Sequence, residues 1–144
     1  MKQYTIGVDL GGTNIAAGLV DAENKIVDLM SCKTNLPRPS QEIEQAIAEI
    51  CRELAKRNHL SWEDDVALVG IGAPGSVNAR TGIVEFNANF GYRDWHLVHN
   101  MEQRLHCKVL IENDANAAAY GEYIAGAARG AGCMVMITLG TGIG

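Results

Sequence analysis

The first residues in this chain that could do chemistry form an acidic, glycine-rich cluster. Asp9 lies near the end of a short apolar run, and four residues follow it almost at once: Gly11, Gly12, Thr13 and Asn14. Glycines leave backbone N–H groups open to an approaching anion, and Thr13 adds a hydroxyl. The cluster could hold a phosphate chain, with Asp9 facing its Mg²⁺ directly or through water. A plain hairpin turn with Asp9 as a turn acid would use the same residues, so both interpretations stay open.

A second glycine–threonine cluster lies near the other end of the sequence. An apolar run leads to Leu139 and then to Gly140, Thr141 and Gly142. The cluster is not a Walker A loop, because no lysine follows it, and its spacing does not fit a Rossmann fingerprint. Two such clusters are more specific than either alone. Together they suggest two loops that grip one polyphosphate from opposite sides.

A polar pair, Asn113 and Asp114, follows another apolar run. Strand ends are where α/β sheets present residues to ligands. Asp114 is therefore a candidate general base that takes a proton from a hydroxyl group. Asn113 beside it both donates and accepts hydrogen bonds, which suits a sugar hydroxyl. The alternative is that Asp114 or Asn113 only caps the helix that follows, a role that both residue types favour.

Two further polar segments follow predicted strands and are interpreted as loops. Residues 73–76 include Gly75, and residues 87–95 include Asn89 together with several aromatic side chains. Each loop could line a polar small-molecule pocket. Asn87 and Asn89 could equally be ordinary turn formers.

The pattern of apolar residues predicts the elements that must position these clusters. Apolar runs predict strands at 4–10, 15–20, 25–33, 66–72, 108–112 and 133–139. Apolar residues at helical spacing predict helices at 40–57, 97–105 and 115–128, the first of them capped by Ser40. A three-stranded meander followed by alternating helices and strands indicates an α/β fold, a mixed sheet with helices on its faces.

Length and composition exclude several classes of protein. The chain has 144 residues, a formal net charge of −5 and 47% hydrophobic residues, which suits one globular domain and makes it a poor nucleic-acid binder. No apolar run approaches the roughly 20 residues that a membrane span needs. The four cysteines form no CxxC pair, which argues against a zinc site and a disulfide scaffold. Their spacing favours a reducing, cytoplasmic compartment.

Three motifs, at 6–14, 111–119 and 137–144, together resemble the ROK family of repressors and sugar kinases. Within that family the chain looks like the bacterial glucokinases. The motifs stand in the family's order, and the resemblance covers the whole chain. It implies a ribonuclease-H-like domain of the actin/hexokinase-type ATPases.

The resemblance also implies roles for individual residues. ATP phosphates would be bound by the two glycine–threonine clusters, at Gly11, Gly12, Thr13, Asn14, Gly140, Thr141 and Gly142. Asp9 would face Mg²⁺, and Asp114 would be the catalytic base. The sugar would be contacted by four residues: Gly75, Asn89, Asn113 and Asp114.

The activity implied is that of a transferase in carbohydrate metabolism and glycolysis, an ATP-dependent kinase that converts glucose to glucose 6-phosphate. By this resemblance, residues 1–144 are the N-terminal domain of a longer kinase and are inactive alone. The absent C-terminal domain would hold the adenosine pocket and any structural zinc. We expect a cytoplasmic homo-oligomer, such as a dimer, that binds sugar and ATP but no nucleic acid or membrane.

Two alternatives to a glucokinase stay open. The sugar could instead be fructose, mannose or an N-acetyl-hexosamine, because the residues that choose the sugar lie partly outside this chain. A non-catalytic, sugar-sensing member of the family is the other alternative. An intact Asp114 argues against it, and so does the position of the first motif, which leaves no room for a DNA-binding module before Asp9.

Overall fold

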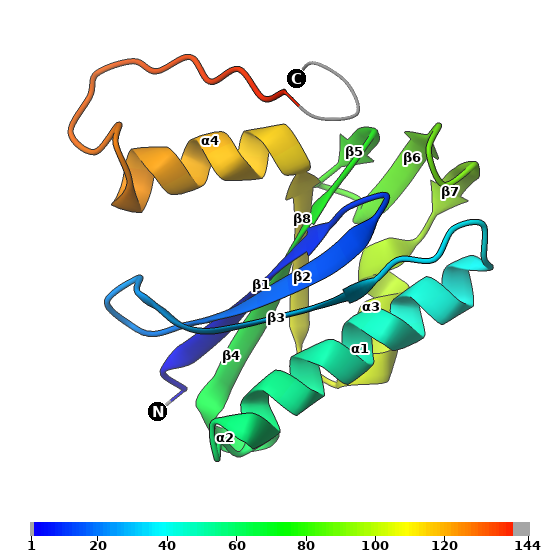
Figure 1. Ribbon diagram of the computed structural model, residues 1–144, viewed down its shortest axis with the longest axis horizontal. Coiled ribbons are helices and arrows are strands. Elements are labelled where there is room, and N and C mark those ends of the chain that lie inside the picture. The colour runs from blue at the N-terminus through cyan, green and yellow to red at the C-terminus, as the bar shows by residue number, and fades with distance from the viewer. Residues whose placement is uncertain (1, 140–144) are drawn as a thin grey trace.

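A five-stranded mixed sheet is the centre of the computed structural model, which describes residues 2–139 (Figure 1). The strands are β1 (Tyr4–Leu10), β2 (Asn14–Val20), β3 (Ile26–Lys33), β4 (Val66–Ala73) and β8 (Lys108–Asn113). They lie in the order β3-β2-β1-β4-β8. The first three form an antiparallel meander, and β4 and β8 run parallel to β1. The predicted mixed α/β fold is therefore confirmed.

Helices cover the two faces of this sheet unequally. They are α1 (Ser40–Arg57), the short α2 (Trp62–Asp65), α3 (Leu97–Leu105) and α4 (Asp114–Ala125). Figure 1 shows α1 and α3 on one side of the sheet and α4 on the other. No helix among residues 2–139 is both long enough and apolar enough to span a membrane.

The hydrophobic core lies between the sheet and the helices α1 and α3. Ile6 and Leu10 of β1 are fully buried there, and so are Ile43, Ile47 and Leu54 of α1. These α1 residues recur at helical spacing, so they share one face of the helix. Burying each such side chain contributes about 1.5–3 kcal/mol.

A second, smaller antiparallel sheet contains β5 (Ser76–Asn78), β6 (Ile83–Asn87) and β7 (Tyr92–Trp95). The prediction of a loop over 87–95 is wrong at its end, because residues 92–95 form β7. Tyr92 and Trp95 pair with β6, and their ring centroids lie 5.0 Å from each other and 5.6 and 6.5 Å from that of Phe90. Tertiary pairing and aromatic packing thus override a polar, glycine-containing local sequence.

Two further differences concern element ends. Pro39, not Ser40, flanks α1: it has the extended backbone of an N-cap residue (φ −60°, ψ 148°), and Ser40 already belongs to the first turn. The predicted strand at 133–139 is absent over 133–138. Its apolar side chains lie exposed, with Val135 at 86%, and no described strand runs beside it to supply backbone hydrogen bonds.

A buried carboxylate, Glu44 of α1, joins this helix to the second sheet and to α3. It is 2% exposed and accepts hydrogen bonds from Trp95 Nε1 (2.8 Å), Asn100 Nδ2 (2.8 Å) and Arg104 Nε (3.2 Å). One side chain therefore ties α1 to β7 and to α3.

Replacing Glu44 by Ala is expected to lower the free energy of unfolding by about 3 kcal/mol, because three donors lose their acceptor in a buried place. Chemical denaturation of the purified chain measures this. The matched control is Gln45→Ala at the exposed neighbouring position, which should cost less than about 0.5 kcal/mol. Equal losses for the two variants would contradict the assignment.

Candidate active site

The parallel strands β1, β4 and β8 bring the first and third polar clusters to one edge of the sheet. Asp9 of β1 lies beside Gly72 of β4, which in turn lies beside Glu112 of β8. Asp114 begins α4 directly after β8. Residues that are far apart in the sequence therefore meet where the three strands end (Figure 1).

Gly72 lies at this meeting point, and it was not among the predicted site residues. A Cβ atom there would lie 3.5 Å from the Cα of Asp114 and 3.6 Å from the Cβ of Ala117. Both are ordinary van der Waals separations, so the first turn of α4 packs closely on the sheet at Gly72, beside Asp9. The signal in the sequence was a glycine near the carboxyl end of a buried strand, where a close backbone approach is typical.

The environment of the Asp9 carboxyl group at this edge changes its acidity. The pKa of Asp9 is raised, first because the fold desolvates its carboxyl group and second because of the negative charge of Asp114. Such a pair disfavours full ionisation unless a cation lies nearby.

Oxygen donors in this arrangement fit Mg²⁺, which proteins usually bind through one or two carboxylates together with waters and substrate phosphates. Asp9 is the residue that would hold the ion. Within residues 2–139, no group of three or more His, Cys, Asp or Glu side chains could hold a metal ion by itself. A metal at this edge would therefore depend on oxygens from a ligand.

The glycine-rich turn between β1 and β2 projects from the same edge. It is a hairpin turn, as one interpretation predicted, closed by the Gly11 N–H donating to Asn14 O at 3.0 Å. A Cβ on Gly11 would lie 2.7 Å from that oxygen, so glycine is required there. Gly12, Thr13 and Asn14 are exposed, which leaves the turn open to a ligand. The residues Gly140, Thr141 and Gly142 of the second cluster lie outside the described residues.

The capping role belongs to Asn113 and not to Asp114. Asn113 Oδ1 accepts from the backbone N–H groups of Ala115 (3.1 Å) and Asn116 (3.3 Å) at the start of α4. Asp114 is the first residue of that helix, and its Oδ1 accepts from Ala115 N at 2.8 Å. No described residue donates a hydrogen bond to Asp114 Oδ2. That oxygen can accept a proton.

The other two predicted sugar-contacting residues lie on adjacent loops. Gly75 has a φ of +98°, and a Cβ there would lie 2.3 Å from Phe86 O, so no other residue fits. Its carbonyl accepts from Asn113 Nδ2 at 3.1 Å. Asn89 is exposed on the loop after β6. Its neighbour Asn87 is indeed a turn former, because Asn87 Oδ1 accepts from Asn89 N at 2.9 Å.

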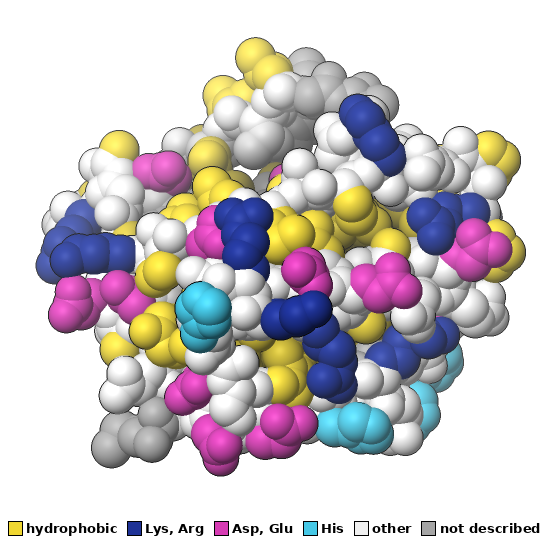
Figure 2. All heavy atoms as spheres, turned by 60° about the horizontal axis from the view of Figure 1, so that its bottom comes forward, with side chains coloured by type: hydrophobic (Ala, Val, Ile, Leu, Met, Phe, Trp, Pro, Cys, Tyr) yellow, Lys and Arg dark blue, Asp and Glu magenta, His cyan; other side chains and the backbone are white. Residues whose placement is uncertain are grey.

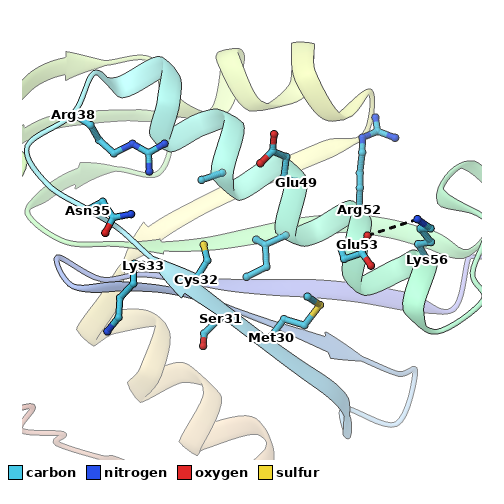
Figure 3. Close-up of a pocket in the computed structure, with 12 residues that line it drawn as sticks. Met30, Ser31, Cys32, Lys33, Asn35, Arg38, Glu49, Arg52, Glu53 and Lys56 are labelled. Carbon is cyan, nitrogen blue, oxygen red and sulfur yellow. Dashed lines mark ion pairs between the residues drawn. The ribbon is translucent and has the colours of Figure 1, made fainter.

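A hollow in the described part of the chain lies elsewhere, between β3 and α1 (Figure 3). Its volume is about 700 Å³, and it contains none of the predicted site residues. Three of its lining side chains take part in ion pairs: Arg38 pairs with Glu42, and Lys56 pairs with Glu53. Figure 2 shows acidic and basic side chains interspersed on the face at the bottom of Figure 1. The predicted site residues that the structure describes lie at the strand ends and the adjacent loops, and not in this hollow.

Comparisons with known proteins agree with this arrangement. The family model described as "ROK family" matches residues 5–144. The glucokinase of Streptomyces coelicolor is 44% identical over 140 residues, which are 97% of this chain and 42% of that protein. This chain therefore spans less than half the length of that relative.

Solved structures give the same result. A ROK family glucokinase from Streptomyces griseus, in complex with glucose and AMPPNP, superposes with a TM-score of 0.86 at 42% identity. The match covers 98% of this chain and 43% of that one. An inorganic polyphosphate/ATP-glucomannokinase from Arthrobacter superposes with a TM-score of 0.87 at 32% identity, covering 99% of this chain and 57% of the other.

Proposed function

This chain belongs to the ROK family, and we propose that the full-length protein containing it is an ATP-dependent glucokinase. Residues 1–144 are then its N-terminal domain. One observation carries the proposal: Asp9 and Asp114 lie at the same strand ends, beside the glycine-rich turn whose residues Gly12 and Thr13 are exposed. A pair of carboxylates next to a turn that can bind phosphate suits the transfer of a phosphoryl group to a hydroxyl.

In the proposed mechanism, each cluster of the site has one task. Asp114 accepts the proton of the sugar 6-hydroxyl through its free Oδ2, a contribution typically worth 10²–10⁴-fold. Backbone N–H groups of the turn at 11–14 bind ATP phosphates, and Gly140, Thr141 and Gly142 bind them from the other side. Asp9 holds Mg²⁺, which when bound neutralises charge on the phosphates. Gly75, Asn89 and Asn113 orient the sugar.

A sugar panel on the full-length protein tests this proposal. With ATP and Mg²⁺, glucose should give a kcat/KM at least about tenfold above fructose and N-acetylglucosamine. Mannose and inorganic polyphosphate belong in the panel, because a glucomannokinase that uses either donor superposes well. Sugar binding without ADP formation would favour a sugar-sensing protein instead. If none of the sugars in the panel led to ADP formation, the proposal of a sugar kinase would be contradicted.

We expect residues 1–144 alone to melt cooperatively but to reach less than about 1% of the full-length turnover. A misplacement of about 1 Å between donor and acceptor can cost 100-fold, and one domain cannot hold both substrates together. A melt followed by circular dichroism and a coupled assay for ADP with glucose measure both properties. A non-cooperative melt, or turnover near that of the full-length protein, would contradict the expectation.

The same resemblance leads us to propose a cytoplasmic homo-oligomer, such as a dimer, that uses ATP, Mg²⁺ and sugar alone. Size-exclusion chromatography of the full-length protein with light scattering measures its mass. A monomer at micromolar concentration would contradict this part of the proposal.

A further inference from the structure

Three polar side chains are buried in the part of the chain that the structure describes: Thr34, Glu44 and Asn87. Glu44 joins helices and strands, as described above. The other two bond to the backbone of the proposed ligand-binding turns. We infer that Thr34 is a positioning residue for the phosphate turn and that Asn87 is a positioning residue for the two sugar loops. The inference rests on the proposed function.

Thr34 follows β3 and is fully buried beneath the β1–β2 turn. Its Oγ1 donates to Gly11 O at 2.7 Å, and its backbone N–H donates to Thr13 O at 2.9 Å. Both carbonyl groups of the turn therefore point inward to Thr34. In a trans peptide the next N–H points the opposite way, so the N–H groups of Gly12 and Asn14 point away from Thr34. Thr34 thus sets the direction in which the turn offers donors to a phosphate.

Asn87 ends β6 and makes three hydrogen bonds from one buried side chain. Its Oδ1 accepts from the backbone N–H groups of Asn89 (2.9 Å) and Phe90 (3.1 Å). Its Nδ2 donates to Pro74 O at 2.6 Å. The loop that carries Asn89 is therefore joined directly to the loop that carries Gly75.

The Asn87 network continues to the proposed base. The carbonyl of Gly75 accepts from Asn113 Nδ2, and Asn113 caps the helix that begins with Asp114. A single chain of hydrogen bonds thus runs from the Asn89 loop to the first turn of α4. Thr34 has no part in that chain, and Asn87 has none in the phosphate turn. The two residues should therefore affect different substrates.

Two conservative substitutions in the full-length protein separate the roles. Thr34→Val keeps the shape and the backbone N–H but removes the hydroxyl that holds Gly11 O. Asn87→Asp keeps the acceptor for Asn89 and Phe90 but places a carboxylate oxygen against Pro74 O. We expect Thr34→Val to raise the KM for ATP about tenfold, and Asn87→Asp to raise the KM for glucose about tenfold. In each variant the other KM should stay within about twofold.

Thr34→Val and Asn87→Asp serve as controls for each other. Glu44→Gln is a further control, because it changes a buried polar residue that contacts neither the phosphate turn nor the sugar loops. It should leave both KM values within about twofold. Asn87→Ala, which buries no new charge, repeats the Asn87 test if the Asp variant does not fold. Melting curves establish that the variants compared are folded.

The outcomes distinguish this inference from the proposed function. A full-length protein that phosphorylates no sugar would overturn the proposed function and this inference with it. The full-length protein could instead be active while each variant raises the KM values for ATP and glucose equally, or raises neither of them. That result would overturn this inference and leave the proposed function standing. Thr34 and Asn87 would then only support the fold.

Discussion

Replacing Asp114 by Asn in the full-length protein is expected to lower kcat at least 100-fold, while the affinity for sugar changes by less than about tenfold. Asn has the same shape but cannot accept the proton of the sugar hydroxyl. The helix should stay intact, because Asn113 makes the capping bonds of α4 and Asp114 is only its first residue. Steady-state kinetics and equilibrium glucose binding measure the two quantities.

The control for this prediction is Glu63→Gln, the same loss of one carboxylate charge in the first turn of another helix, α2. Glu63 is exposed and lies near the amino end of β4, away from the strand ends that carry the site. It should leave kcat within about twofold. If Asp114→Asn lowered kcat less than about tenfold, Asp114 would not be the base.

Replacing Asp9 by Asn should lower turnover about 100-fold, raise the Mg²⁺ concentration needed for activity and also stabilise the fold at neutral pH. The folded state raises the pKa of Asp9 through desolvation and the charge of Asp114. A group whose pKa is raised on folding costs stability as the pH rises from its ordinary value of 3.8 through its folded value. Asn removes that cost together with the proposed metal ligand.

Melting temperatures across a pH series and Mg²⁺ titrations of turnover test the Asp9 prediction. The variant should melt above the wild type at pH 7, and the difference should shrink below pH 3.8, where the wild-type carboxyl is protonated. Glu63→Gln again serves as the control and should show no such pH-dependent gain. If Asp9→Asn instead melted lower and lost sugar binding and turnover equally, Asp9 would be a structural residue.

Local patterns in the sequence were sufficient to predict most elements of this fold. Short apolar runs predict β1 and β2, and helical spacing predicts α1, because each pattern depends only on residues within one element. The same patterns are misleading where tertiary contacts decide. Residues 92–95 form a strand because β6 lies beside them. The apolar residues 133–138 form no strand, because no described strand lies beside them.

The chemistry-bearing clusters were also visible in the sequence, because an acid before Gly-Gly-Thr or an Asn-Asp pair after an apolar run depends on neighbouring residues alone. How these clusters are placed relative to one another was decided only by the tertiary structure. Strand register sets Asp9 beside Gly72, and the first turn of α4, which carries Asp114, packs against Gly72. The hydrogen bonds from Asn87 to Pro74 O and from Asn113 to Gly75 O likewise arise from contacts between segments that are separated in the sequence. Such contacts depend on how elements pair and pack, which no local pattern of residue types encodes.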